Sequence, residues 1–208
     1  MKKYFPHVLL GIYVVEFIVA GVNPYARDVW YVENGPIVAL VAYVVYLYSR
    51  NIRFSNTAYA LMFILPFLHT IGGHYTFERV PFDWFNNFFG FERNMFDRVA
   101  HFAVGFYALS IIEYLVGRGL VAKKWVAVTY SIFAIAFVAV FYEWIEWWYA
   151  ELWGGEAGAA FLGSQGDIWD AQKDMLLDVM GAALTAGGYL IAQFSKVRKE
   201  NPEKTHFM

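Results

Sequence analysis

The residues of this chain that could do chemistry are imidazoles and carboxylates set within or beside long apolar segments. They are His69, His74, Asp97, His101, Glu143, Glu146, Asp167, Asp170, Asp174 and Asp178. Asp97 and His101 are four residues apart, and Glu143 and Glu146 are three apart, so each pair shares one face of an α-helix. Ionisable side chains are costly inside a bilayer, which makes a functional role the first interpretation of such a set.

The aspartates near the C-terminal apolar segment repel one another unless something neutralises them. On a helix that begins early enough, Asp167, Asp170, Asp174 and Asp178 cover an arc of about 80° and share one face. A divalent metal ion is an efficient solution, because carboxylate oxygens and imidazoles suit Zn, Mn, Fe or Mg. The Glu-x-x-His pairs of di-iron bundles are absent, so Zn or Mn ranks above Fe and Mg. The predicted metal ligands are His69, His74, Asp97, His101, Asp174 and Asp178.

A metal at this place would activate a bound water, whose pKa can fall from 15.7 to about 7. We predict that Glu143 or Glu146 acts as the general base for that water. Asp167, Asp170, Gln165 and Arg98 are predicted substrate or loop residues beside it. Each residue also has a structural interpretation: a core histidine bonded to a carbonyl, an acid paired with Arg98 or Arg93, or a carboxylate at a helix N-terminus.

The elements that must position these residues are long apolar helices. The chain of 208 residues is 59% hydrophobic and 16% charged, against about 25% charged in soluble domains. Aromatic residues make up 21%, and a net charge of −2 gives no nucleic-acid footprint. The composition predicts one all-α, polytopic transmembrane bundle, residues 1–208, retained in the membrane. Its expected spans are about 5–22, 36–50, 57–75, 97–116, 125–149 and 175–194.

Lysine and arginine predict the orientation of these six spans. One side of the membrane receives 11 of the 16 Lys and Arg residues, and the other receives 5. The positive-inside bias therefore predicts that both termini are cytoplasmic. The imidazoles and carboxylates then converge at the extracytoplasmic end. Two long connections, about 76–96 and 150–174, lie on that side; the first is aromatic-rich and expected in the interface, and the second is glycine-rich.

Two resemblances bear on this pattern. Four strings together resemble the YjdF-like bacterial inner-membrane proteins, the DUF2238 family, over roughly residues 60–195. The strings are His69-x-x-Gly72-Gly73-His74-Tyr75-Thr76, Asp97-Arg98-x-x-His101-Phe102-x-x-Gly105, Tyr142-Glu143-x-x-Glu146-Trp147 and Gly163-Ser164-Gln165-Gly166-Asp167-x-x-Asp170-x-x-x-Asp174-Met175. The resemblance implies a small multi-spanning inner-membrane protein and no particular activity. The last string also resembles the first aspartate motif of UbiA-type prenyltransferases, but Gly166 replaces the usual Asn and no second motif follows.

The sequence thus favours a metal-dependent hydrolase that acts on a lipid or lipid-linked substrate in the bacterial inner membrane. One alternative is a metal-free structural or chaperone-like membrane protein, in which the acids and imidazoles form a buried network. Another is a transporter of metal or small solutes, although the inner halves of the spans are almost purely apolar. The sequence does not decide the oligomeric state.

Overall fold

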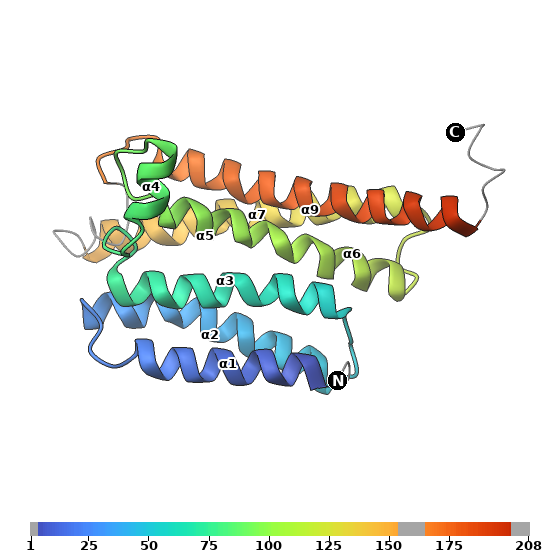
Figure 1. Cartoon of the computed structure of the whole chain (residues 1–208), viewed down its shortest axis with the longest axis horizontal. Coiled ribbons are helices and arrows are strands. Elements are labelled where there is room, and N and C mark those ends of the chain that lie inside the picture. The colour runs from blue at the N-terminus through green and yellow to red at the C-terminus, as the bar shows by residue number, and fades with distance from the viewer. Residues whose placement is uncertain (1–3, 154–164, 201–208) are drawn as a thin grey trace.

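The computed structural model describes residues 4–153 and 165–200, and this part of the chain is all helical, without strands. The helices lie side by side along the long axis of the molecule, and α1 begins at the end of the bundle where α9 finishes (Figure 1). The elements are α1 (Phe5–Ala20), α2 (Arg27–Ser49), α3 (Asn56–Tyr75), α4 (Asp83–Phe89), α5 (Phe96–Val104), the 3₁₀ helix η2 (Gly105–Tyr107), α6 (Ala108–Gly117), α7 (Lys124–Trp153) and α9 (Asp170–Glu200). The all-α prediction is confirmed.

Within the described residues, four stretches are long and apolar enough to cross a membrane, namely Arg27–Ser49, Phe96–Gly117, Lys124–Leu152 and Asp170–Ser195. α1 is a shorter apolar helix. Large apolar side chains on these helices point outward, as at Val15, Phe137 and Ile191, which are more than 60% exposed. Lipid chains can cover such a surface, so the exterior of the bundle suits a bilayer.

α2 begins at Arg27, so the prediction that this segment starts near residue 36 was wrong. Pro36 lies inside the helix, although its ring nitrogen cannot donate the usual hydrogen bond. The first turns are instead held by packing against α3. A Cβ atom on Gly73 would lie 2.6 Å from Asn34 Nδ2 and 3.3 Å from Glu33 Cβ. Gly73 thus lets α2 approach closely enough to bury Glu33 and Asn34.

In the sequence, the pair Gly72-Gly73 predicts an end of the third helix that would leave His74 in a loop, and this prediction is wrong. α3 continues to Tyr75 and finishes at Thr76, whose φ of 56° is left-handed. Gly72 serves packing, because a Cβ there would lie 2.3 Å from the Phe77 ring. The Phe77 amide donates to the Gly72 carbonyl at 2.7 Å, which folds that ring back over the helix.

α5 and α9 touch through their backbones. A Cβ on Gly105 would lie 2.1 Å from the Ala182 nitrogen, and one on Gly181 would lie 2.1 Å from the Phe102 carbonyl oxygen. Small residues permit such close helix crossings in membranes. The contact presses the turn of α5 that carries His101 against the first turns of α9.

α9 begins at Asp170, so Asp167 lies before the helix and not on it. The predicted single face of four aspartates is therefore reduced to three, Asp170, Asp174 and Asp178, at intervals of four residues. Residues 154–164 of the glycine-rich connection lie outside the described part of the chain.

We predict that Gly181→Ala destabilises the bundle by about 1–3 kcal/mol, because the new methyl group overlaps the Phe102 carbonyl and the helices must separate. Thermal unfolding of the purified protein in detergent micelles measures this. Gly187→Ala on the same helix is the control, since its Cβ would have no neighbour within 4 Å. Equal melting temperatures of the two variants would contradict the role given to the contact.

Candidate functional site

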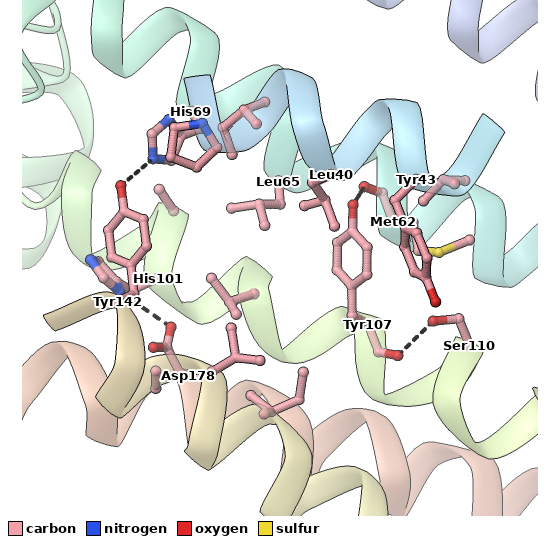
Figure 2. Close-up of a pocket in the computed structure, with 18 of the residues that line it drawn as sticks. Leu40, Tyr43, Met62, Leu65, His69, His101, Tyr107, Ser110, Tyr142 and Asp178 are labelled. Carbon is pink, nitrogen blue, oxygen red and sulfur yellow. Dashed lines mark hydrogen bonds and ion pairs between the residues drawn. The ribbon is translucent and has the colours of Figure 1, made fainter. Parts of the chain in front are cut away.

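A cavity of about 600 Å³ separates α2 and α3 from α5, α6 and α7 (Figure 2). One end of it is polar, and the remainder is lined mainly by apolar side chains, together with Ser110 and several tyrosines. The polar end is formed by Glu33, His69, Asp97, His101, Tyr142, Glu146 and Asp178. Residues from five helices therefore meet at the end of the bundle that carries α4, as the sequence predicted for most of them.

His101 is the centre of this polar end. Its Nδ1 lies 3.3 Å from Asp178 Oδ1, and its Nε2 lies 3.7 Å from Asp97 Oδ1 and 3.8 Å from Asp174 Oδ1. Asp178 Oδ1 can accept the proton of Nδ1, and Nε2 faces Asp97 and Asp174. Asp97, His101 and Asp174 each offer one ligand atom, and these atoms all lie within 4.8 Å of one another.

Asp174 divides its two oxygens between different partners. Oδ2 forms an ion pair with Arg98, whose guanidinium also pairs with Asp170, and the Arg98 side chain is only 4% exposed. Oδ1 is buried and has no hydrogen-bond partner. A buried acceptor without a partner is unfavourable by about 1–3 kcal/mol. A cation or a hydrogen-bond donor bound to this oxygen beside His101 would remove that unfavourable free energy.

The remaining aspartates near the start of α9 are compensated by basic side chains. Arg93 Nη1 lies 2.7 Å from Asp170 Oδ1, and Lys173 Nζ lies 2.6 Å from Asp167 Oδ2. The hydrogen bond from Lys173 holds the pKa of the Asp167 carboxyl below its usual range. This pairing is therefore kept at neutral pH and is lost when the pH falls through that lowered pKa. Asp167 and Asp170 thus tie α9 to α5 and are not available as metal ligands.

His69 lies across the cavity from His101. Its Nε2 is 3.7 Å from Glu33 Oε2 and 3.4 Å from the hydroxyl of Tyr142, whose ring stands between the two histidines (Figure 2). His69 is buried, and its Nδ1 has no hydrogen-bond partner. His69 therefore belongs to a second polar group, in which Glu33 and His69 of the opposite wall meet the hydroxyl of Tyr142 from α7, and it is not one of the three clustered ligands.

The two glutamates of α7 differ in their surroundings. Glu146 lines the cavity, whereas Glu143 is 8% exposed and has one oxygen without a hydrogen-bond partner. Glu143 is close enough to interact electrostatically with His101, Asp174 and Asp178. Glu146 thus has access to a molecule in the cavity. Glu143 lies near the carboxylate cluster and does not line the cavity.

Three predicted site residues have structural roles away from the cavity. His74 Nδ1 lies 2.7 Å from the Ala20 carbonyl oxygen, which fixes the end of α1. The side chain of Gln165 bonds both the backbone nitrogen and the carbonyl of Asn94, at 3.0 and 3.1 Å. Arg98 is enclosed by its ion pairs with Asp170 and Asp174 and positions them, so it is not free to bind a substrate.

The sequence interpretation missed Glu33. The second span was predicted to begin near residue 36, where Pro36 follows Gly35. Glu33 was therefore placed outside the membrane-spanning helices and was not considered as a site residue. The available signal was the apolar stretch on both sides of it, with Val29, Trp30 and Ile37 all buried. An acidic residue within such a stretch is unusual enough to mark a site.

A sequence-family model described as "Predicted membrane protein (DUF2238)" matches residues 5–194. The chain belongs to this family. It is also 29% identical over 170 residues to the inner membrane protein YjdF of Escherichia coli strain K12, covering 81% of this chain and 80% of that protein. No solved structure matches. Together with the apolar helices, these findings identify a multi-pass inner-membrane protein and confirm the resemblance noted in the sequence.

We predict that Arg98→Met destabilises the protein by about 3–5 kcal/mol, because it leaves Asp170 and Asp174 as buried charges with a partner removed. Denaturant titration in detergent measures the effect. Arg79→Met is the matched control, since Arg79 makes two surface contacts, a pair with Glu78 at 3.2 Å and a position 4.3 Å over the exposed ring of Tyr25, and its loss should change stability by about 1 kcal/mol or less. A similar loss in both variants would show that Arg98 does not stabilise the start of α9 in this way.

Proposed function

We propose that this protein is a metal-dependent hydrolase of the inner membrane that acts on a lipid or lipid-linked substrate. The observation that carries the proposal is the unpartnered Oδ1 of buried Asp174, which faces His101 Nε2 beside Asp97. A divalent cation bound to these three atoms would satisfy all of them at once. Zn or Mn suits a donor set of two carboxylates and one imidazole, with Fe or Mg as alternatives.

The distances support this assignment. Ligand atoms around a four-coordinate Zn²⁺ with bonds of about 2.0 Å lie roughly 3.3 Å apart. The separations of 3.7 and 3.8 Å from His101 Nε2 need a contraction of about half an ångström, and the ligand oxygens of Asp97 and Asp174, which lie within 4.8 Å of each other, need one of up to about 1.5 Å. Three protein ligands also leave a coordination position for water, which is typical of catalytic sites.

Asp178 fits a supporting role better than that of a ligand. It faces Nδ1, the other nitrogen of the His101 ring, at 3.3 Å. A carboxylate in this position fixes the tautomer and orientation of a metal-bound histidine. Arg98 acts similarly on Asp174, because its ion pair with Oδ2 directs Oδ1 toward His101.

The metal would supply a water of lowered pKa. Glu146, which lines the cavity, would accept a proton from that water as its oxygen adds to the electrophilic atom of the substrate ester. The bond to the leaving oxygen then breaks, and the leaving oxygen takes up the proton. His69 from α3 and Tyr142 from α7, which both line the cavity, would hydrogen-bond the substrate during this step.

We also propose the topology that gives this site its surroundings: six crossings, made by α1, α2, α3, α5–α6, α7 and α9, with both termini in the cytoplasm. The excess of Lys and Arg at the end where the termini lie supports it. The site then opens near the extracytoplasmic headgroups, where a lipid or lipid-linked substrate can reach it.

Metal analysis tests the proposed ligands. We predict that wild-type protein purified without chelators holds a divalent ion, that Asp174→Asn and His101→Ala lose it, and that Asp178→Asn binds it about 10–100-fold more weakly. His74→Ala should retain it, because that ring bonds the Ala20 carbonyl. Elemental analysis and metal titration give the values. Metal-free wild-type protein that melts unchanged on adding Zn or Mn would favour the alternative of a metal-free structural network.

Single-cysteine labelling tests the topology, since the chain has no cysteine of its own. A membrane-impermeant maleimide added to spheroplasts should label Glu92→Cys, which lies beyond α4, and should spare Lys123→Cys, which lies between α6 and α7. Lys123→Cys should react once the membrane is permeabilised. The reverse pattern would place the site on the cytoplasmic side.

A further inference from the structure

The cavity continues from its polar end into a part that is mainly apolar, with Ser110 and the rings of Tyr43, Tyr107, Tyr114 and Tyr130 also in the lining. Along α2 the whole cavity extends from Glu33 at the polar end, through Ile37, Leu40 and Val44, to Leu47. Glu33 and Leu47 are fourteen residues apart, which corresponds to about 21 Å of helix at 1.5 Å per residue. We call the part of the cavity beyond the polar end the apolar groove. It lies parallel to the helices and therefore parallel to the lipid chains of the bilayer.

The groove opens sideways between α2 and α7. α2 packs on α3, whereas α7 packs on α6 and α9, so the groove fills the space between the two groups (Figure 2). Two of its lining residues, Tyr43 on α2 and Tyr130 on α7, are 58% and 57% exposed on the outer surface of the bundle. A lipid chain could enter there directly from the bilayer, without leaving the hydrocarbon.

From these dimensions we propose that the apolar groove holds one acyl chain of a membrane lipid. Counted from an ester at the polar end, a chain that reaches Leu47 is about sixteen carbons long, at about 1.25 Å per carbon for an extended chain of 1.5 Å bonds. The headgroup ester of that lipid then lies beside Asp97, His101 and Asp174. This assignment rests on the proposed function for the chemistry at the polar end, and it names the substrate class. A polyprenyl chain is branched and much longer than the groove.

The groove positions its lipid more than it attracts it. Bilayer chains are as apolar as the leucines that line the groove, so transfer between them releases little free energy. What the groove supplies is register: a chain of matching length sets the ester at the depth of His101. Orientation of this kind is a recognised source of catalytic rate, and it discriminates between chain lengths.

The experiment is native mass spectrometry of protein purified from the inner membrane in a mild detergent, with the lipids of the adduct identified after dissociation. Wild-type protein should retain one lipid with a chain of about sixteen carbons. Leu40→Trp fills the groove and should lower the retained fraction at least tenfold. Leu184→Trp is the matched control: Leu184 is 65% exposed on α9 and does not line the groove, so that variant should retain the lipid.

Ile111→Trp, which fills the groove from α6, guards against a folding defect peculiar to Leu40→Trp, and melting temperatures are compared for all variants. Equal retention by wild-type protein and both groove variants would mean surface lipid only and would overturn the proposal, as would a polyprenyl lipid in the wild-type adduct. Metal content measured on the same samples separates the two proposals. A specific acyl adduct without metal would support the acyl-chain groove and contradict the metal-dependent hydrolase. Metal without an adduct would support the metal site and contradict the acyl-chain groove.

Discussion

The backbone contact between α5 and α9 is the constraint on which the rest of the structure depends. Where Gly105 meets Ala182 and Gly181 meets Phe102, no side chain separates the two helices. His101 lies one turn before Gly105, and Asp178 and Asp174 lie one and two turns before Gly181. The crossing therefore brings an imidazole of one helix within 3.3–3.8 Å of carboxylates of the other. A Cβ at Gly105 or Gly181 would lie 2.1 Å from the backbone of the other helix, so larger residues would force the helices apart and separate these groups.

The carboxylates brought together in this way are neutralised in two different manners. Toward the start of α9, Asp167 and Asp170 are met by Arg93, Arg98 and Lys173. Toward the cavity, basic side chains give way to imidazoles, and Asp174 has one oxygen in each region. The ion pairs of the first region hold the start of α9 in place. In the second region, Oδ1 of Asp174 has no hydrogen-bond partner. Burial of an unpaired carboxylate oxygen is unfavourable. Of the two oxygens of Asp174, Oδ2 is therefore stabilised by Arg98, and Oδ1 is the one that can still accept a partner.

The helical class, the start of α3 and the meeting of His101 with Asp97, Asp174 and Asp178 could all be predicted from apolar runs and helical spacing. The start of α2 could not, because Pro36 signals a boundary locally, whereas packing of Glu33 and Asn34 on Gly73 overrides it. Similarly, His74 has the same chemistry as His69 in the sequence, and only the position of α1 gives it the Ala20 carbonyl as a partner. The spacing of residues in the sequence shows which side chains share one face of a helix. The helix or side chain that packs against that face comes from a distant part of the sequence, and spacing does not show it.

The unequal lengths of the helices have a consequence for the surrounding bilayer. α1 has 16 residues and is about 24 Å long, shorter than a hydrocarbon core of about 30 Å, whereas α9 has 31 residues. In a bundle that crosses the membrane as proposed, this hydrophobic mismatch thins the bilayer beside α1 while the side that carries α9 keeps its full thickness. The protein would therefore be surrounded by an asymmetric lipid annulus, and membranes of different thickness would tilt the bundle and change the depth of its polar end.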